Sequence, residues 1–474
     1  MTTAPSAPRL SLPRLAAFSL PGFSVGALAV ALSVYLPHYY AAHYGLALAA
    51  IGAAFGFIRF GDMFLDPFIG VAMDRTRTGF GRYKIWLVAG APVLMLAVYM
   101  LFSPPGGVSI LYLAGWLLVY YLGFSLVVLA HSSWASVAAV NYHDRSRVFG
   151  IIQMVSILGA ALVLVVPVLM AKANGASGKG DVPAMGWFIV IAVPVGVGAA
   201  VAFTRERIVR DAHSERFAAK DYWEMITRPD MRRIIIADFC LALGPGWMSS
   251  LYLFYFHDSR GFTIASASSL LFIYIAAGVI GAPLLAALAH RLGKHRTLQV
   301  ASTGYSLGLT AVAFLPKGNY LLTAVLMFAL GFMAAGFPLL DRAMVADVGD
   351  AVRLEKGKQR TGLLYAMIST TQKLASSASI ALSFTLLGAI GYQGKEGAAN
   401  SPASIHGMEL VYILVPIVFV MLGGACFFGY KLDSRRHADI RAQLESRDAE
   451  LTEAPILESL GGDHGVATRA ASSN

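Results

Sequence analysis

The longest stretch without a charged side chain covers residues 85–143 and reads IWLVAGAPVLMLAVYMLFSPPGGVSILYLAGWLLVYYLGFSLVVLAHSSWASVAAVNYH. Its 59 residues contain no Asp, Glu, Lys or Arg. About 20 apolar residues span a bilayer as a helix, which satisfies its own backbone polar groups there. The stretch is long enough for two such helices, separated by the turn-forming sequence SPPGG at residues 103–107. It therefore predicts an all-α membrane protein.

The composition of the whole chain agrees with this interpretation. Of 474 residues, 57% are hydrophobic and 14% are charged, whereas soluble domains carry about 25% charged residues. Further uncharged gaps recur along the chain and predict additional membrane-spanning helices. The pattern predicts twelve spans, at residues 15–38, 45–72, 85–103, 109–131, 149–171, 183–204, 233–256, 262–289, 297–316, 319–346, 362–391 and 408–430.

The positive charge follows the predicted turns. If the N-terminus is cytoplasmic, 29 of the 37 Lys and Arg lie on the cytoplasmic side, five lie outside and three lie within spans. This bias fits the positive-inside rule. It explains the net charge of +10 better than nucleic-acid binding does, so no nucleic-acid partner is expected. We expect an inner-membrane protein with both termini cytoplasmic and without a cleavable signal peptide.

The predicted spans fall into two groups of six. Residues 1–204 form the first half, a basic cytoplasmic linker covers 205–232, and residues 233–431 form the second half. Residues 432–474 are charged and then rich in Gly and Ser, which predicts a partly disordered cytoplasmic tail. Two six-helix halves joined by a basic loop are typical of the major facilitator fold, whose binding site lies near the membrane midplane.

Three ionisable residues lie inside the second predicted span. Arg59, Asp62 and Asp66 are spaced by three and seven residues, which places them on one helix face. Ionisable groups at membrane depth are costly and usually functional. Two carboxylates and one guanidinium leave a negative site that a proton or Na⁺ would neutralise. The alternative is a local Arg–Asp pair without a coupling role.

Two later spans also carry charge. Lys373 lies too deep in the eleventh span to reach the membrane surface easily, so we expect it to pair with the span-two carboxylates when the cation is absent. Asp341 lies beside Arg342 in the tenth span and is either a solute contact or half of a structural ion pair. Asp238 lies near the cytoplasmic end of the seventh span, where an interfacial position is expected.

Neutral polar side chains supply further candidates for solute binding. Trp134 ends the fourth span and offers a flat apolar ring that can stack on a sugar; the alternative is a residue of the membrane interface. His131 and Gln153 lie nearby in the sequence, although a histidine in a helix is more often packed than functional.

Signatures of enzymes are missing from the sequence. There is no H-E-x-x-H motif, no nucleophile elbow and no phosphate loop. The two cysteines, Cys240 and Cys426, lie in apolar segments and suggest neither a disulfide framework nor a metal site. We therefore expect neither catalysis nor a cofactor, and a coupling ion instead.

Residues 59–86 read RFGDMFLDPFIGVAMDRTRTGFGRYKIW. This pattern resembles the glycoside–pentoside–hexuronide:cation symporters of the major facilitator superfamily, whose best-known member is the melibiose permease, and the resemblance covers about residues 15–430. It implies cation-site carboxylates at Asp62 and Asp66, a partner lysine at Lys373, a sugar-stacking Trp134 and a monomer. It also implies a conformational latch formed by Asp74, Arg77, Gly81, Arg82 and Lys84.

The sequence departs from the melibiose permease at several positions. Gly26 and Ala130 replace its sugar-binding aspartates, and Val127 replaces a threonine that helps to ligate sodium. A proton needs only one carboxylate, so these departures favour H⁺ over Na⁺. The leading hypothesis is cation-coupled import of a small sugar-like solute. A cavity lined by Gly26, Val127, Ala130 and Ile152 would instead suit an amphiphilic or lysolipid-like solute.

Overall fold

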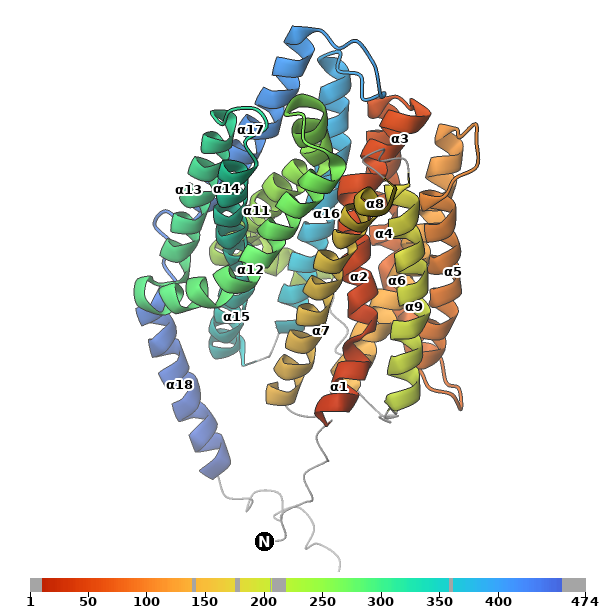
Figure 1. Cartoon of the computed structure of the whole chain (residues 1–474). Helices are drawn as coiled ribbons and strands as arrows, with labels where there is room; N and C mark the ends of the chain where they lie inside the picture. Colours follow the sequence, from red (N-terminus) through yellow and green to blue (C-terminus); the bar gives the residue numbers. More distant parts are fainter. Residues whose placement is uncertain are drawn as a thin grey trace, which may run out of the picture.

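The computed structural model describes residues 11–138, 142–174, 180–204, 206, 219–357 and 361–453, which form helices joined by turns and contain no strand (Figure 1). The first half begins with one continuous helical segment, Leu12–Tyr44. Its parts are α1 (Leu12–Ser19), α2 (Pro21–Val30), the π-helical segment η1 (Ala31–Tyr35) and α3 (Leu36–Tyr44). The next helices are α4 (Leu48–Arg75), α5 (Lys84–Phe102), α6 (Ile110–Ala138), α7 (Tyr142–Val163), α8 (Val165–Asn174) and α9 (Asp181–Phe203).

The second half repeats this plan. Its elements are α11 (Pro229–Leu253), the π-helical segment η2 (Phe254–Ser259), α12 (Ile264–Leu292), α13 (Lys294–Ala313), α14 (Tyr320–Ala334), α15 (Gly336–Lys356), α16 (Thr361–Ala389) and α17 (Pro402–Ala425). With α7 and α8, α11 and η2, and α14 and α15 each counted as one run, the described residues contain twelve long helical segments. The predicted fold class is confirmed.

Ten of the twelve segments are long and apolar enough to cross a membrane. The other two are α13, which opens with the polar sequence KHRTLQ, and α16, which carries Lys373 and many Ser and Thr side chains. Segment ends differ from the prediction by several residues. For example, α6 runs to Ala138 rather than 131, because polar residues continue a helix that hydrophobicity alone would end.

Two further helices lie outside these segments. α10 (Ala219–Thr227) precedes the second half, and α18 (Ser434–Glu453) follows it. α18 rests against α15, where His437 Nε2 lies 3.0 Å from Asp350 Oδ2. Much of the predicted linker, and the tail beyond 453, lie outside the described residues.

Close packing inside the first half depends on Gly26. A Cβ there would overlap the carbonyl of Ser156, and a Cβ on Gly22 would lie 2.9 Å from the carbonyl oxygen of Ile152. The G-x-x-x-G spacing thus lets α2 and α7 approach each other closely. Gly26 is therefore a packing residue and is not among the residues that line the cavities described below, which corrects the expectation above.

The two halves meet along α4 and α16, which lie side by side (Figure 1). Ser377 Oγ donates a hydrogen bond to the carbonyl of Gly56 at 2.8 Å. We call the end of the bundle with Leu12 and α18 the terminal face, and the end with Tyr44 and Ser259 the far face. The contact between α4 and α16 positions the candidate site about midway between these faces.

Candidate functional site

Four charged side chains from both halves gather where α4 meets α16. Arg59 Nη1 lies 3.0 Å from Asp62 Oδ2. Lys373 Nζ of α16 forms an ion pair with Asp66 Oδ2 and lies 3.6 Å from Asp62 Oδ2. The spacing of 59, 62 and 66 places the α4 members on one face. Together they form the charge cluster Arg59, Asp62, Asp66 and Lys373.

The charge cluster is electrostatically balanced, with Asp62 buried and the other three members partly buried. Asp62 is only 1% exposed, and two carboxylates face two cationic groups. Burial without such pairing would cost several kcal/mol per charge. The second cationic group therefore comes from the other half of the protein.

Two residues of α6 complete the surroundings of the cluster. Ser125 Oγ donates a hydrogen bond to Asp62 Oδ1 at 2.8 Å, and the Arg59 guanidinium lies 4.9 Å from the ring centre of Tyr121. Asp66 Oδ1 is buried and accepts no hydrogen bond within the described residues. Sequence reasoning did not assign Tyr121, because one tyrosine in an apolar span carries no distinguishing signal.

A cavity of about 280 Å³ lies next to the charge cluster and between the halves. Arg59 lines this central cavity and also contacts Asp62, so it connects the two sites. Serine and aromatic residues make up most of the lining, and most of the surface that faces the cavity is apolar. The polar and aromatic lining residues are Ser33, Phe55, Arg59, Tyr120, Tyr121, Phe124, Ser249, Ser250, Ser376, Ser377 and Ser379.

The predicted solute contacts from α6 and α7 lie elsewhere. Trp134 is 0% exposed and packs edge-on against Phe18, with ring centres 5.0 Å apart. His131 Nε2 lies 2.8 Å from the carbonyl oxygen of Phe18. Both side chains hold α6 against α1 in this conformation, whereas Gln153 is exposed on α7. The structure does not bring these three residues to the central cavity.

Asp341 faces a separate pocket inside the second half. This pocket has a volume of about 340 Å³ and is also lined by Asp238 and Gln372. Gln372 Nε2 donates to Asp238 Oδ1 at 3.1 Å, while Asp341 Oδ1 has no hydrogen-bond partner within the described chain. Asp238 is 2% exposed, so its expected interfacial position was wrong. The helix turns its side chain toward α15 and α16 instead of the membrane surface.

The predicted latch encloses an acidic side chain that the prediction had not included. Glu206 accepts hydrogen bonds from the backbone N–H groups of Arg82, Tyr83 and Lys84, at 2.8 to 3.0 Å for the shortest contact of each. These groups begin α5, where a helix N-terminus favours an anion. In the sequence, Glu206 is a single acidic residue among several arginines, in the stretch TRERIVR. That isolated position was the only feature that could have indicated its role.

The remaining latch residues surround this contact. Gly81 has φ +135°, and a Cβ there would meet the Glu206 carboxylate. Arg82 donates to the carbonyl of Asp74, whose side chain accepts from Tyr83 Oη at 3.0 Å. Burial and the Asp74 carboxylate raise the pKa of Tyr83 to about 12. Arg77 is exposed. The described latch contacts thus join the first half to the start of the linker and do not reach the second half.

Residues 17–434 match the family described as MFS/sugar transport protein. The chain belongs to this family. The resemblance to glycoside–pentoside–hexuronide:cation symporters is confirmed, and the protein is a multi-pass membrane transporter of a solute and not an enzyme.

Three relatives of this MFS transporter each match more than four fifths of the chain. An uncharacterized symporter of Bacillus subtilis, YnaJ, is 25% identical over 85% of this chain and 88% of its own length. The isoprimeverose transporter of Lactiplantibacillus pentosus is 25% identical, with 86% of each chain covered. A lactose permease of Lactobacillus delbrueckii is 26% identical over 82% of this chain, but the match spans 65% of that longer permease.

Solved structures share the MFS fold. The nucleoside transporter NupG superposes with a TM-score of 0.66, at 12% identity, over 88% of this chain and 99% of NupG. A bacterial homolog of the human lysosomal transporter Spinster, in an inward-facing and unoccupied conformation, gives a TM-score of 0.64 at 12% identity, over 92% of this chain and 97% of the homolog. These likenesses concern the fold alone.

Proposed function

We propose that the protein is a symporter that couples the import of a small sugar-like solute to a cation, with H⁺ favoured over Na⁺. The observation that carries this proposal is the charge cluster, which draws residues from both halves and adjoins a cavity lined largely by serine and aromatic residues. Import fits a protein of the inner membrane with cytoplasmic termini, the orientation that the distribution of Lys and Arg favours.

Coupling follows from the Lys373–Asp66 ion pair. Lys373 is the cation that the protein itself supplies from the second half, and an entering cation competes with it for the carboxylates. Displacement of Lys373 removes an electrostatic bond between α4 and α16, which lets the halves move. Arg59 lines the cavity and contacts Asp62, so solute binding also alters the charge balance of the cluster. By linkage, the bound cation then raises the affinity for the solute, and the bound solute raises the affinity for the cation.

The surroundings of the carboxylates favour a proton. Hard metal cations need several oxygen ligands, whereas Ser125 is the neutral oxygen donor in contact with Asp62 in the described structure. Val127, which replaces a sodium-ligating threonine of the melibiose permease, is buried and offers none. Protonation of Asp66 at its open oxygen would release Lys373 without a coordination shell.

The lining of the central cavity favours a sugar over an amphiphile. Serine hydroxyl oxygens of α11 and α16 can accept hydrogen bonds from a polyol, and the rings of Tyr121 and Phe124 offer flat apolar surfaces. The volume of about 280 Å³ is near the lower end for ligand pockets, roughly 300 Å³, so a small solute fits better than a lysolipid. The names of the relatives, among them an isoprimeverose transporter and a glucuronide carrier protein homolog of Escherichia coli, suggest glycosides and uronates as first tests.

The test is transport by the full chain in liposomes. Solid-supported-membrane currents are recorded for pentosides, hexosides, uronates and a lysolipid, with and without Na⁺, at two pH values. We expect sodium-independent currents that follow the proton gradient and disappear in Asp62→Asn and Asp66→Asn. Asp439→Asn, an exposed substitution on α18, is the matched control and should retain them.

Other outcomes would contradict separate parts of the proposal. Currents that require Na⁺ would overturn the choice of ion, and currents with the lysolipid alone would overturn the choice of solute. Uncoupled flux that both aspartate variants retain would overturn the assignment of the charge cluster.

A further inference from the structure

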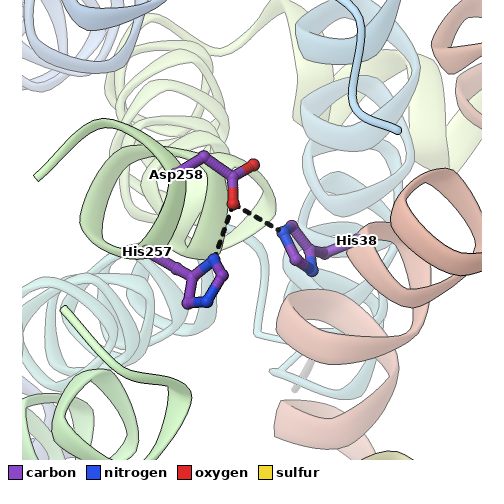
Figure 2. Close-up of side chains that lie close together, drawn as sticks. All are labelled: His38, His257 and Asp258. Atoms are coloured by element: carbon purple, nitrogen blue, oxygen red, sulfur yellow. Dashed lines mark hydrogen bonds and ion pairs between the residues drawn. The ribbon is translucent and has the colours of Figure 1, made fainter. Parts of the chain in front are cut away.

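A second polar cluster joins the halves at the far face. His38 of α3 belongs to the first half, and His257 and Asp258 of η2 belong to the second (Figure 2). Asp258 Oδ1 lies between the two imidazoles, 3.3 Å from His38 Nε2 and 2.7 Å from His257 Nδ1. One potential ligand atom from each residue lies within 4.8 Å of the other two.

The chemistry of these three side chains suits a transition metal. Two imidazoles and one carboxylate are a common ligand set for Zn²⁺, whose bonds of about 2.0–2.1 Å place tetrahedral ligand atoms roughly 3.3 Å apart. Asp258 Oδ1 lies close to that spacing from both imidazoles, at 3.3 and 2.7 Å, and the three ligand atoms lie within 4.8 Å of one another.

The surroundings supply the rest of a metal site. Tyr392 Oη donates to Asp258 Oδ2 at 3.2 Å, which orients the carboxylate in the way that outer hydrogen bonds orient metal ligands. His38 is 6% exposed and packs on Phe254, with ring centres 4.7 Å apart. A cavity of about 690 Å³ borders all three side chains and offers an entry path and room for a water as fourth ligand.

We propose that His38, His257 and Asp258 form a site for a divalent transition-metal ion of the zinc class, which bridges the two halves at the far face. The bridge lies beside a direct contact between the halves, Tyr35 Oη to Ser268 Oγ at 2.6 Å. Bound metal therefore locks the far face shut and opposes opening of the transporter on that side. This consequence for transport rests on the proposed function, whereas metal binding does not.

The experiment measures Zn²⁺ binding to the purified full chain, without a polyhistidine tag, by isothermal titration calorimetry in detergent. We expect one ion per chain, with Mg²⁺ unable to compete. His38→Gln, His257→Gln and Asp258→Asn should each weaken binding at least tenfold, and Tyr392→Phe should weaken it less. His257 has a side chain that is 38% exposed, so His257→Gln is the variant that best preserves the fold.

The matched control is His406→Gln, also in the second half, because the His406 side chain is 70% exposed and lies outside the cluster. It should bind Zn²⁺ as the unmodified protein does. Equal metal-free melting temperatures verify that the variants are folded. Absence of binding, equal competition by Mg²⁺, or binding that His38→Gln and His257→Gln retain would overturn the site and leave an ordinary ion-paired closure of the far face. Because none of these readouts measures transport, failure here is distinguishable from failure of the symporter proposal.

Discussion

Lys373 on α16 and Asp66 on α4 are separated by 307 positions in the sequence, yet they form an ion pair across the interface between the two halves. Asp62 lies beside them with its own partner, Arg59. The local charges balance only because both halves contribute. A transporter that must separate its halves thus places an electrostatic bond where they meet, and the strength of that bond depends on what occupies the carboxylates.

The first prediction concerns this bond. Asp66→Asn and Lys373→Met should each lower the melting temperature, because each removes one member of a partly buried ion pair and leaves the opposite charge less well compensated. The double variant should lose less than the sum of the two, with a coupling energy of about 1–3 kcal/mol. Thermal unfolding in detergent measures it. Lys317→Gln, at an exposed lysine, is the control, and additive effects would show that the pair contributes nothing.

The second prediction concerns Ser125. Ser125→Ala removes the hydrogen bond to Asp62 Oδ1 and leaves a buried carboxylate oxygen unsatisfied, at a cost of about 1–3 kcal/mol. Proton-driven solute current should fall roughly tenfold. Ser125→Thr keeps the hydroxyl and should retain most of the current. Equal currents from the two variants would show that the hydroxyl has no role in coupling.

The third prediction concerns the central cavity. Ser249→Leu would place an isobutyl group in the space that we assign to the solute, so the solute concentration for half-maximal transport should rise at least tenfold. Ser249→Ala should have a smaller effect. Thr303→Leu makes a comparable change at an exposed position of α13 and should be neutral. An unchanged solute affinity in Ser249→Leu would place the solute elsewhere.

The fourth prediction separates a structural role of Asp341 from solute binding. Asp341 and Asp238 line one pocket, and Asp341 Oδ1 lacks a partner in the described structure. Replacement of a buried unpaired carboxylate by a neutral amide removes its desolvation cost. Asp341→Asn should therefore raise the free energy of unfolding by about 1 kcal/mol, which corresponds to a few degrees in the melting temperature. Transport should stay intact. Loss of transport in a folded variant would restore Asp341 as a solute contact.

The fifth prediction concerns the latch. Glu206→Gln retains one acceptor oxygen but loses the charge at the N-terminus of α5, so stability should fall by about 0.5–2 kcal/mol. Gly81→Ala should cost more, because φ at this position is +135° and the new methyl group meets the same carboxylate. Gly79→Ala in the same loop, where a Cβ has no neighbour within 4 Å, is the matched control. Equal melting temperatures for Gly81→Ala and Gly79→Ala would contradict this account.

Sequence reasoning identified the fold and the charge cluster for a physical reason. Long uncharged segments have few uses other than membrane spans, and a charge inside such a segment stands out. Arg59, Asp62 and Asp66 shared a helix face by spacing alone, and Lys373 was conspicuous in an otherwise uncharged helix. The neutral side chains that contact these charges, Ser125 and Tyr121, were harder to predict from the sequence.

The sequence did not predict which way the neutral and aromatic side chains point. Trp134 and His131 have the chemistry of solute contacts, but they face α1, since helix rotation is set by packing partners that no single sequence reveals. The role of Gly26 could not be predicted for the same reason: its small size allows α2 to pack closely against α7. The serines of the central cavity carried no signal, because serine in a membrane helix commonly bonds its own backbone, as Ser250 does with Gly246 at 2.9 Å.

The π-helical segments η1 and η2 have a consequence for anyone who redesigns this protein. Each lies in the first segment of its half, and each precedes or contains residues of the far-face cluster. A π-turn holds an extra residue relative to an α-turn, so every side chain beyond it is rotated by about 100° compared with a regular helix. A helical wheel drawn through Leu12–Tyr44 would therefore assign His38 to the wrong side. Deleting one residue from Ala31–Tyr35 would replace the π-turn by a regular α-turn and rotate the His38 imidazole away from Asp258. The rotational position of a side chain around this helix is therefore a design variable separate from its amino-acid identity.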